Sequence, residues 1–337
     1  MKGEIKMKQE EMLSSALNAL NEVVKISSND DVLILHDVHC QSIAGAFHSA
    51  AGSKGCRTDS FLINEKDRPL TGIPKGLVEL LKGKTIVLNI LKAFPEEINF
   101  RIKWLFKIEE NKKIKCAHMP GITEAMMTEG PMNINYMHMG NIASALIKKL
   151  NNADHLHITA KAGTDLILGV KNRIFASDVT VEPGKVSNLP CGEIYCAPEE
   201  TRADGVIVFD ASIGDIGLLK LPLKVFINKG KVIRFESEDE KLVERITELS
   251  SVDEEARVIG ELGIGINPGA RITGNMLEDE KAIYTVHIAF GNNEDFPGGG
   301  KNHSKIHRDY LLYKPSIEII YNDKSNNLLM REGEFLI

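Results

Sequence analysis

The first half of the chain alternates between amphipathic segments and short apolar runs. Apolar positions recur at helical spacing and predict helices over residues 7–26, 41–54 and 75–82. The runs between them predict strands over residues 31–36, 58–63 and 84–89. Because the run at 31–36 is mostly apolar, we expect it to lie buried in a parallel sheet. Strands that alternate with helices favour an α/β, Rossmann-like scaffold domain over residues 1–150.

After residue 150 the pattern changes to short runs in which apolar and polar residues alternate. These runs predict strands over residues 155–159, 178–181, 205–213, 223–228, 231–236, 317–321 and 334–337. The turn sequence Asn-Lys-Gly-Lys at 228–231 predicts a hairpin, and one charged helix is expected over 239–251. We therefore expect a mainly antiparallel β (α+β) C-terminal domain over residues 151–337.

Carboxylates and imidazoles occur in this second half, each beside glycine or apolar residues. The candidates are Glu193, Glu261, His287, His307 and Asp309. Residues two apart on a strand point to the same face, so His307 and Asp309 can reach one ion. Mixed imidazole and carboxylate ligands suit zinc, iron, manganese or cobalt better than an all-sulfur structural site does. The sequence therefore predicts a metal site in the C-terminal domain.

Each candidate also has an ordinary interpretation. Glu261 could be a surface residue before a turn, and a lone histidine in an apolar strand, such as His287, more often packs in the core. Cys191 and Cys196 flank Glu193, but we interpret them as packed thiols rather than ligands. The prediction of a metal site therefore depends on the whole set and not on one residue.

Composition narrows the class of function. The chain has 337 residues and a net charge of −6, which argues against nucleic acid as a partner because phosphates attract basic surfaces. No apolar run reaches the roughly 18 residues that cross a bilayer, and the charged N-terminus does not resemble a signal peptide. Five cysteines without CxxC spacing fit reduced thiols. We therefore expect a cytoplasmic protein.

Phosphate-binding loops are missing from the sequence. No GxGxxG follows the first predicted strand, and GxxxxGK[ST] occurs nowhere in the chain. Both motifs present backbone N–H groups to nucleotide phosphates. A nucleotide-binding role is therefore unsupported, and we interpret the α/β half as scaffold.

Four motifs follow one another in an order that resembles the M29 family of metalloaminopeptidases. They are Asn-x-Pro-x-Gly-Glu ending at Glu193, Glu-x-Gly-Ile-Gly-x-Asn starting at Glu261, His-Ile-Ala-Phe-Gly starting at His287, and Gly-Gly-x-Asn-x-Ser-x-x-His-x-Asp ending at Asp309. The resemblance covers about residues 155–315. It implies that Glu193 and His287 hold one metal ion, that His307 and Asp309 hold another, and that Glu261 bridges the two.

The resemblance also implies an activity. Members of the family hydrolyse N-terminal residues from short peptides with two divalent ions and water activated by the metal. For this chain we expect one or two ions of zinc, cobalt or manganese. Glu261 would then be the catalytic carboxylate. The family's dimeric habit implies a homodimer.

One departure from the family pattern leaves alternatives open. The resemblance implies a tyrosine ligand seven residues after His287, but position 294 is Glu294 and the segment 291–297 contains no tyrosine. Either Glu294 or Asp295 replaces that ligand, or the second metal is absent.

The 2,5-dihydroxypyridine dioxygenases of the same fold family use one ferrous ion, whose ligands would correspond to Glu261, His307 and Asp309. Substrate contacts or acid–base groups could then come from His118, His138, His155 and His157, for each of which ordinary packing or solvent exposure is the alternative interpretation. A third alternative is a non-catalytic relative that binds metal or peptide.

Overall fold

The computed structural model describes the backbone of residues 2–337 and the side chains from residue 6 onward. The chain forms two compact units. Unit 1 comprises residues up to His138 together with Asp178–Cys191, and unit 2 comprises Met139–Ser177 and Gly192–Ile337. The sequence predicted one boundary at residue 150. The observed division differs because a strand from beyond that point returns to the sheet of unit 1.

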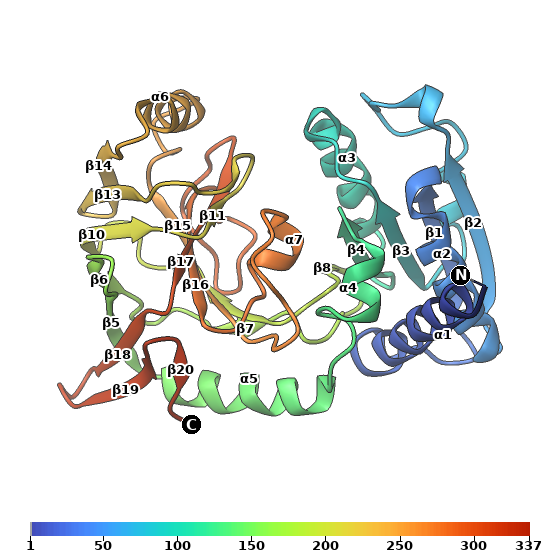
Figure 1. Ribbon diagram of the computed structural model, residues 1–337, viewed down its shortest axis with the longest axis horizontal. Helices are drawn as coiled ribbons and strands as arrows, with labels where there is room; N and C mark the ends of the chain where they lie inside the picture. The colour runs from blue at the N-terminus through green and yellow to red at the C-terminus, as the bar shows by residue number, and fades with distance from the viewer. Residues whose placement is uncertain (1) are drawn as a thin grey trace. The chain divides into compact units, whose positions relative to one another are not determined.

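Unit 1 is built on a five-stranded sheet in the order β2-β1-β3-β4-β8, with every neighbouring pair parallel. The strands are β1 (Asp31–Asp37), β2 (Arg57–Ile63), β3 (Ile86–Leu91), β4 (Lys115–Pro120) and β8 (Lys185–Asn188). Its helices are α1 (Lys2–Ala19), which continues as a π-helical turn (Leu20–Val24), α2 (Gln41–Ser53), α3 (Ile98–Glu109) and α4 (Glu124–Thr128). These elements are blue to green in Figure 1, except β8, which is yellow-green. The predicted α/β arrangement is confirmed.

One face of this sheet packs against α3. Phe100, Trp104 and Ile108 of that helix are fully buried against apolar residues of β1, β3 and β4. The indole N–H of Trp104 donates a hydrogen bond of 2.9 Å to Asn89, so the polar group of this large side chain is satisfied inside the core.

Two predicted elements of this half are wrong. Residues 75–82 form no α-helix but only a 3₁₀ turn at Glu79–Leu81, because Gly76 and Gly83 adopt φ values of +86° and +81° that end helical geometry. Residues 178–181 form no strand; Val181 N donates one hydrogen bond, of 3.0 Å, to Val23 O. Further 3₁₀ turns lie at Val38–Cys40, Glu65–Asp67 and Pro95–Glu97.

Unit 2 contains two antiparallel sheets. The first, in the order β14-β13-β10-β6-β5-β18-β19-β20, consists of β5 (Ala153–Thr159), β6 (Asp165–Gly169), β10 (Ala203–Phe209), β13 (Leu223–Asn228), β14 (Lys231–Glu236), β18 (Ser316–Tyr321), β19 (Asn326–Arg331) and β20 (Glu334–Phe335). The second, in the order β12-β11-β17-β16-β15-β9-β7, consists of β7 (Ala176–Ser177), β9 (Glu193–Cys196), β11 (Ser212–Ile213), β12 (Gly217–Leu218), β15 (Ile259–Gly265), β16 (Thr285–Gly291) and β17 (His307–Tyr313).

The mainly antiparallel prediction for the second half is confirmed. The hairpin between β13 and β14 turns at Asn228–Lys231 as predicted, with Gly230 at φ +78°. The predicted strand over 205–213 is interrupted after Phe209, because the chain passes there from the first sheet to the second. Phe209 meets Tyr310 of β17 at 5.1 Å between ring centroids, so aromatic side chains join the two sheets.

Three helices complete unit 2 and its connections. They are α5 (Tyr136–Leu150), α6 (Glu240–Leu249) and α7 (Met276–Asp279). The charged helix α6, predicted over 239–251, lies beside β14 at the edge of the first sheet (Figure 1). Within residues 2–337 we find no helix of the length and hydrophobicity needed to cross a membrane.

Candidate metal centre

Strand β15 has two chemically different faces, and this difference follows from its sequence Glu-Leu-Gly-Ile-Gly. Side chains alternate between the faces of a strand, so Leu262 and Ile264 point to one side, where both are fully buried. Glu261, Gly263 and Gly265 point to the other side. The glycines leave space beside a buried carboxylate, which is 5% exposed as a residue.

Neighbouring strands place the other candidates on this same face. Residues opposite each other in an antiparallel pair point to one side of the sheet. Glu193 on β9 lies opposite Gly265, and His287 on β16 lies opposite Gly263. A Cβ atom on Gly263 would stand 1.9 Å from Nε2 of His287, so the imidazole occupies the space that this glycine leaves open.

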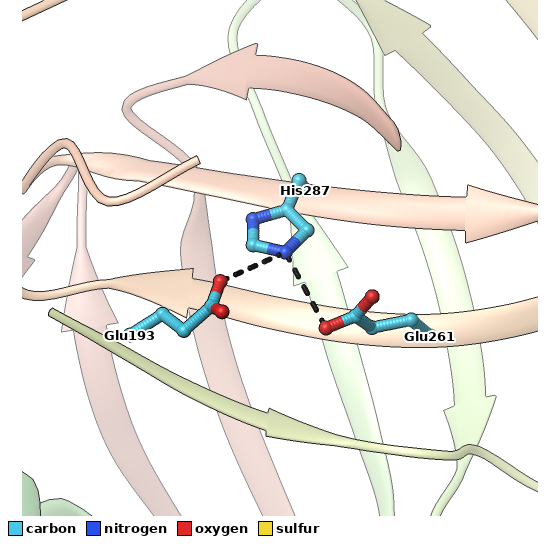
Figure 2. A group of neighbouring side chains, drawn as sticks. All are labelled: Glu193, Glu261 and His287. Atoms are coloured by element: carbon cyan, nitrogen blue, oxygen red, sulfur yellow. Dashed lines mark ion pairs between the residues drawn. The ribbon is translucent and has the colours of Figure 1, made fainter. Parts of the chain in front are cut away.

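The first group of possible ligands consists of Glu193, Glu261 and His287 (Figure 2). Nε2 of His287 lies 3.3 Å from Oε2 of Glu193 and 3.6 Å from Oε1 of Glu261. All three residues are buried. The ring of His287 points between the two carboxylates, so three donor atoms from three strands converge (Figure 2).

The second group consists of Glu261, His307 and Asp309. Nε2 of His307 lies 2.9 Å from Oε2 of Glu261 and 3.4 Å from Oδ1 of Asp309. The other ring nitrogen, Nδ1, lies 2.7 Å from the carbonyl oxygen of Asn292, to which it can only donate. Nε2 of the neutral ring is therefore a lone-pair donor that faces two carboxylates, an arrangement typical of metal-binding histidines.

The ring of His307 is also held by packing. Phe296 stacks on it with 5.7 Å between centroids and 27° between ring planes. Tyr195 packs edge-on against Phe296 at 5.6 Å. This aromatic contact restricts how far the imidazole can turn away from Glu261 and Asp309.

These separations fit a divalent cation. Donor atoms bound about 2.0–2.2 Å from one tetrahedral ion lie roughly 3.3–3.6 Å apart. Three of the four separations above, 3.3, 3.6 and 3.4 Å, fall in that range, and the fourth, 2.9 Å, is a hydrogen-bond distance. The two groups share Glu261, which is the division that the family resemblance implies. Metal binding itself stays a prediction.

The ionisation of these groups reflects their mutual contact. Burial disfavours the charged form of Glu261, but the neighbouring imidazoles of His287 and His307 hold the pKa of its carboxyl well below the usual range. Burial also opposes protonation of His287, yet Glu261 and Glu193 raise the pKa of its imidazole to about 9. Burial opposes protonation of His307 too, and Asp309 and Glu261 raise that pKa well above its ordinary value. The carboxylates therefore stabilise positive charge here, either protons or a metal ion.

Sequence reasoning missed two residues of this centre. Lys281 places its Nζ 2.5 Å from Oε1 of Glu193 and 3.0 Å from Oε1 of Glu280, and its side chain is fully buried. The two missed residues, Glu280 and Lys281, belong to the run Glu-Asp-Glu-Lys at 278–281. In the sequence this run resembles an exposed charged turn, but it is buried throughout. The only sequence signal for a role of this run was that it lies shortly before the strand that carries His287.

Other predicted residues lie outside the two groups. Glu294 is exposed and pairs with Nδ1 of His303 at 2.7 Å, and among the described side chains neither it nor Asp295 joins a candidate metal group. Cys191 and Cys196 are buried thiols that also lie outside both groups, in agreement with their interpretation as packed residues.

The four further histidines belong to neither group of possible ligands. His155 and His157 lie on β5 of the other sheet and pair with Asp154 and Asp165. His118 is buried on β4 of unit 1, and His138 is exposed.

Comparison with known families gives a match over most of the chain. The family model described as thermophilic metalloprotease (M29) matches residues 124–335, which is more than half of the sequence and includes all five predicted ligands.

Two curated relatives resemble this chain in sequence. Aminopeptidase T of Thermus thermophilus is 30% identical over 198 residues, which are 52% of this chain and 47% of that protein. The 2,5-dihydroxypyridine 5,6-dioxygenase of Pseudomonas putida is 27% identical over 196 residues, which are 52% of this chain and 53% of that protein. The match thus spans about half the length of these relatives.

Solved structures of both kinds of protein share the fold. Wild-type AmpT from Thermus thermophilus superposes with a TM-score of 0.75 at 18% identity, covering 97% of this chain and 99% of that one. The 2,5-dihydroxypyridine dioxygenase from Pseudomonas putida superposes with a TM-score of 0.71 at 19% identity, covering 97% of each. At such identities the likeness shows a common fold and does not by itself choose between the two activities.

Proposed function

Because the chain belongs to the M29 family of thermophilic metalloproteases, we propose that it is a metal-dependent aminopeptidase that removes N-terminal residues from short peptides. The observation that supports this proposal is the pair of three-residue groups that share Glu261. Aminopeptidase T, one of its relatives in sequence, carries the same activity in its name. We also propose, from the family resemblance alone, a cytoplasmic homodimer.

The residues of the centre have distinct tasks in this proposal. Glu261, His307 and Asp309 would hold a divalent ion, with Glu193 and His287 as the second possible group. Such an ion, when bound, polarises a peptide carbonyl and lowers the pKa of a bound water toward neutrality.

The chain itself supplies orientation around that ion. Asn292 fixes the tautomer of His307 through its carbonyl oxygen, and Phe296 limits rotation of the ring. Glu261 is central because its two carboxylate oxygens face different histidines, Oε1 toward His287 and Oε2 toward His307. A carboxylate in this position can contribute one oxygen to each group.

Glu261→Gln tests this proposal. The substitution keeps the shape of the side chain but removes its charge, so we expect the metal ion to bind less tightly and peptide hydrolysis to fall about a hundredfold, the upper end of the losses seen when groups around a metal are removed. Release of the N-terminal residue from an unblocked tripeptide, with zinc, cobalt or manganese supplied, is the measurement. An N-acetylated tripeptide is the control and should not be cleaved. Undiminished hydrolysis by Glu261→Gln would reject the role of Glu261.

A second candidate function is ring cleavage by a mononuclear iron dioxygenase. It is favoured by the full-length structural likeness to 2,5-dihydroxypyridine dioxygenase and by the group Glu261, His307 and Asp309, which offers one imidazole and two carboxylates. Oxygen uptake with ferrous ion and 2,5-dihydroxypyridine, in a protein that leaves unblocked peptides intact, would select this alternative.

A further inference from the structure

Lys281 is an unusual member of the metal centre because it is a cation. Its side chain is fully buried, although lysine is almost never buried unless it is paired. Nζ lies 2.5 Å from Oε1 of Glu193 and 3.0 Å from Oε1 of Glu280. One oxygen of Glu193 thus contacts an ammonium group, while the other faces His287 at 3.3 Å.

The backbone fixes this lysine beside β15. Asn267 N donates to Lys281 O at 2.9 Å, and Ile283 N donates to Asn267 O at 3.2 Å. The approach is possible because Gly265 has no side chain: a Cβ there would stand 2.0 Å from the carbonyl oxygen of Ala282. Gly265 also lies opposite Glu193 in the sheet, so the same glycine brings the lysine segment next to that carboxylate.

A divalent ion in the first group would share Glu193 with this ammonium. Two cations on one carboxylate repel each other, and the repulsion is strong where burial excludes water. The second group has no lysine or arginine at ion-pair distance within the described residues: the donor atoms of Glu261, His307 and Asp309 pair with one another, with His287 and with the carbonyl oxygen of Asn292.

The two histidines show the same asymmetry. Nδ1 of His307 is held by the carbonyl oxygen of Asn292, which orients Nε2 toward its carboxylates. Nδ1 of His287 is buried and has no hydrogen-bond partner within the described part of the chain. Nothing therefore fixes the tautomer of His287 in the way that a metal-binding imidazole requires.

We propose that the ammonium of Lys281 serves as the resident cation of the Glu193 group, so that the chain binds a single divalent ion tightly, held by Glu261, His307 and Asp309. This inference rests on the metal dependence in the proposed function and deepens it, because it states how many ions the centre holds and where. A single ion also suits a substrate that approaches from the side of His307, whose side chain is 30% exposed, whereas that of His287 is 1% exposed.

Zinc stoichiometry tests the inference without measuring activity. The full-length protein is treated with a chelator, titrated with zinc in a calorimeter, passed through a desalting column and analysed for zinc per chain. The wild type should keep one zinc per chain. Lys281→Met, which keeps most of the side-chain volume but not the charge, should keep two, with affinity for the second ion increased on the order of a hundredfold. Lys281→Arg keeps the charge and should remain at one.

A second variant places the single ion. Asp309→Asn leaves Lys281 and Glu193 untouched, so it should release the one tight zinc and keep the circular dichroism spectrum of the wild type. Retention of a tight zinc by Asp309→Asn would overturn the inference, because the ion would then lie in the Glu193 group. The same conclusion follows if Lys281→Met folds but still binds one zinc.

The outcome for the inference can be separated from the outcome for the proposed function. Two tight zinc ions in the wild type, with Glu261-dependent peptide hydrolysis, would overturn the inference and leave the peptidase standing. A wild type that binds no zinc and cleaves no peptide would overturn both.

Discussion

Each unit buries a group of charged side chains, but the two groups are completed in different ways. In unit 1, Asp37 accepts hydrogen bonds from the backbone N–H groups of His39 at 2.9 Å and Lys92 at 2.7 Å, and it pairs with Arg68. Glu97 accepts from Nε of the same arginine at 2.8 Å and from Leu70 N at 2.8 Å. One guanidinium and the nearby backbone thus satisfy two carboxylates.

The candidate metal centre of unit 2 has a different balance. Its carboxylates face imidazoles and one lysine, and they outnumber the permanent cations. The carboxylates of Glu193, Glu261, Glu280 and Asp309 compare with the single ammonium of Lys281. Protons on histidine or a metal ion must supply the remaining positive charge. A buried cluster of carboxylates therefore indicates a cation-binding site only where the protein's own hydrogen-bond donors and cations do not balance its charge.

The largest expected effect breaks the complete group of unit 1. Arg68→Met leaves Asp37 and Glu97 buried without their cation, and we expect it to lower the free energy of unfolding by about 3–5 kcal/mol. Urea denaturation followed by circular dichroism measures the change. Arg57→Met is the matched control, since Arg57 is 76% exposed in its ion pair with Asp31 and should cost less than about 0.5 kcal/mol. Equal losses in both variants would contradict the contrast.

A smaller effect is expected from closing the open face of β15. Gly263→Ala adds a Cβ into the space of the His287 ring and should displace the imidazole. His287 need not bind the ion itself to affect zinc binding, because its ring lies beside Glu261. We expect zinc affinity to fall about 10- to 100-fold, the scale of losses when groups that orient metal ligands are removed. Zinc titration is the measurement.

Gly140→Ala is the control for this prediction. A Cβ at Gly140 meets nothing within 4 Å, and the residue lies in helix α5, so zinc affinity should not change. An unchanged affinity in Gly263→Ala would show that the position of His287 is irrelevant to the metal.

The pKa values of two buried histidines, one in each unit, differ in the same way. Burial, reinforced by Arg101, lowers the pKa of His118 to about 3, whereas the carboxylates around His287 raise its pKa to about 9. A folded pKa below the unfolded value of about 6.5 means that His118 contributes fully to stability above that pH and loses the contribution as pH falls toward 3.

We therefore expect His118→Leu to flatten the acid dependence of stability. The difference between the variant and the wild type should change by about 1.4 kcal/mol per pH unit between roughly pH 6 and 4, because one proton is linked to unfolding. Urea unfolding at several pH values measures it. The exposed His138, changed to leucine, should leave the pH dependence as it was. A slope shared by His118→Leu and the wild type would show that His118 is not buried in its neutral form.

Much of the architecture could be predicted because it depends on local patterns. Apolar runs over 31–36 and 84–89 lie within β1 and β3 or beside their ends, and alternating runs after residue 150 became antiparallel strands. One failure was also local in cause: Gly76 and Gly83, with their positive φ values, ended a helix that apolar spacing had predicted. The spacing of apolar residues shows which face of a helix or strand is apolar, but it does not show the backbone conformation of a single glycine.

The identities of the candidate ligands were likewise present in the sequence. Glu261, His287, His307 and Asp309 are recognisable because their residue types bind metals and their motifs follow the family order. Their division into two groups was implied only by resemblance until the pairing of β9, β15, β16 and β17 brought them together.

The sequence by itself determined which chemical groups are available, since donor type and strand alternation are properties of neighbouring residues. The tertiary structure decided their balance of charge. It buried the run at 278–281, placed Lys281 against Glu193, and left Glu294 in solvent. These outcomes depend on pairing between segments far apart in the chain, where one glycine, Gly265, lets two of them approach. Charge and hydrophobicity along the sequence contain no record of that contact.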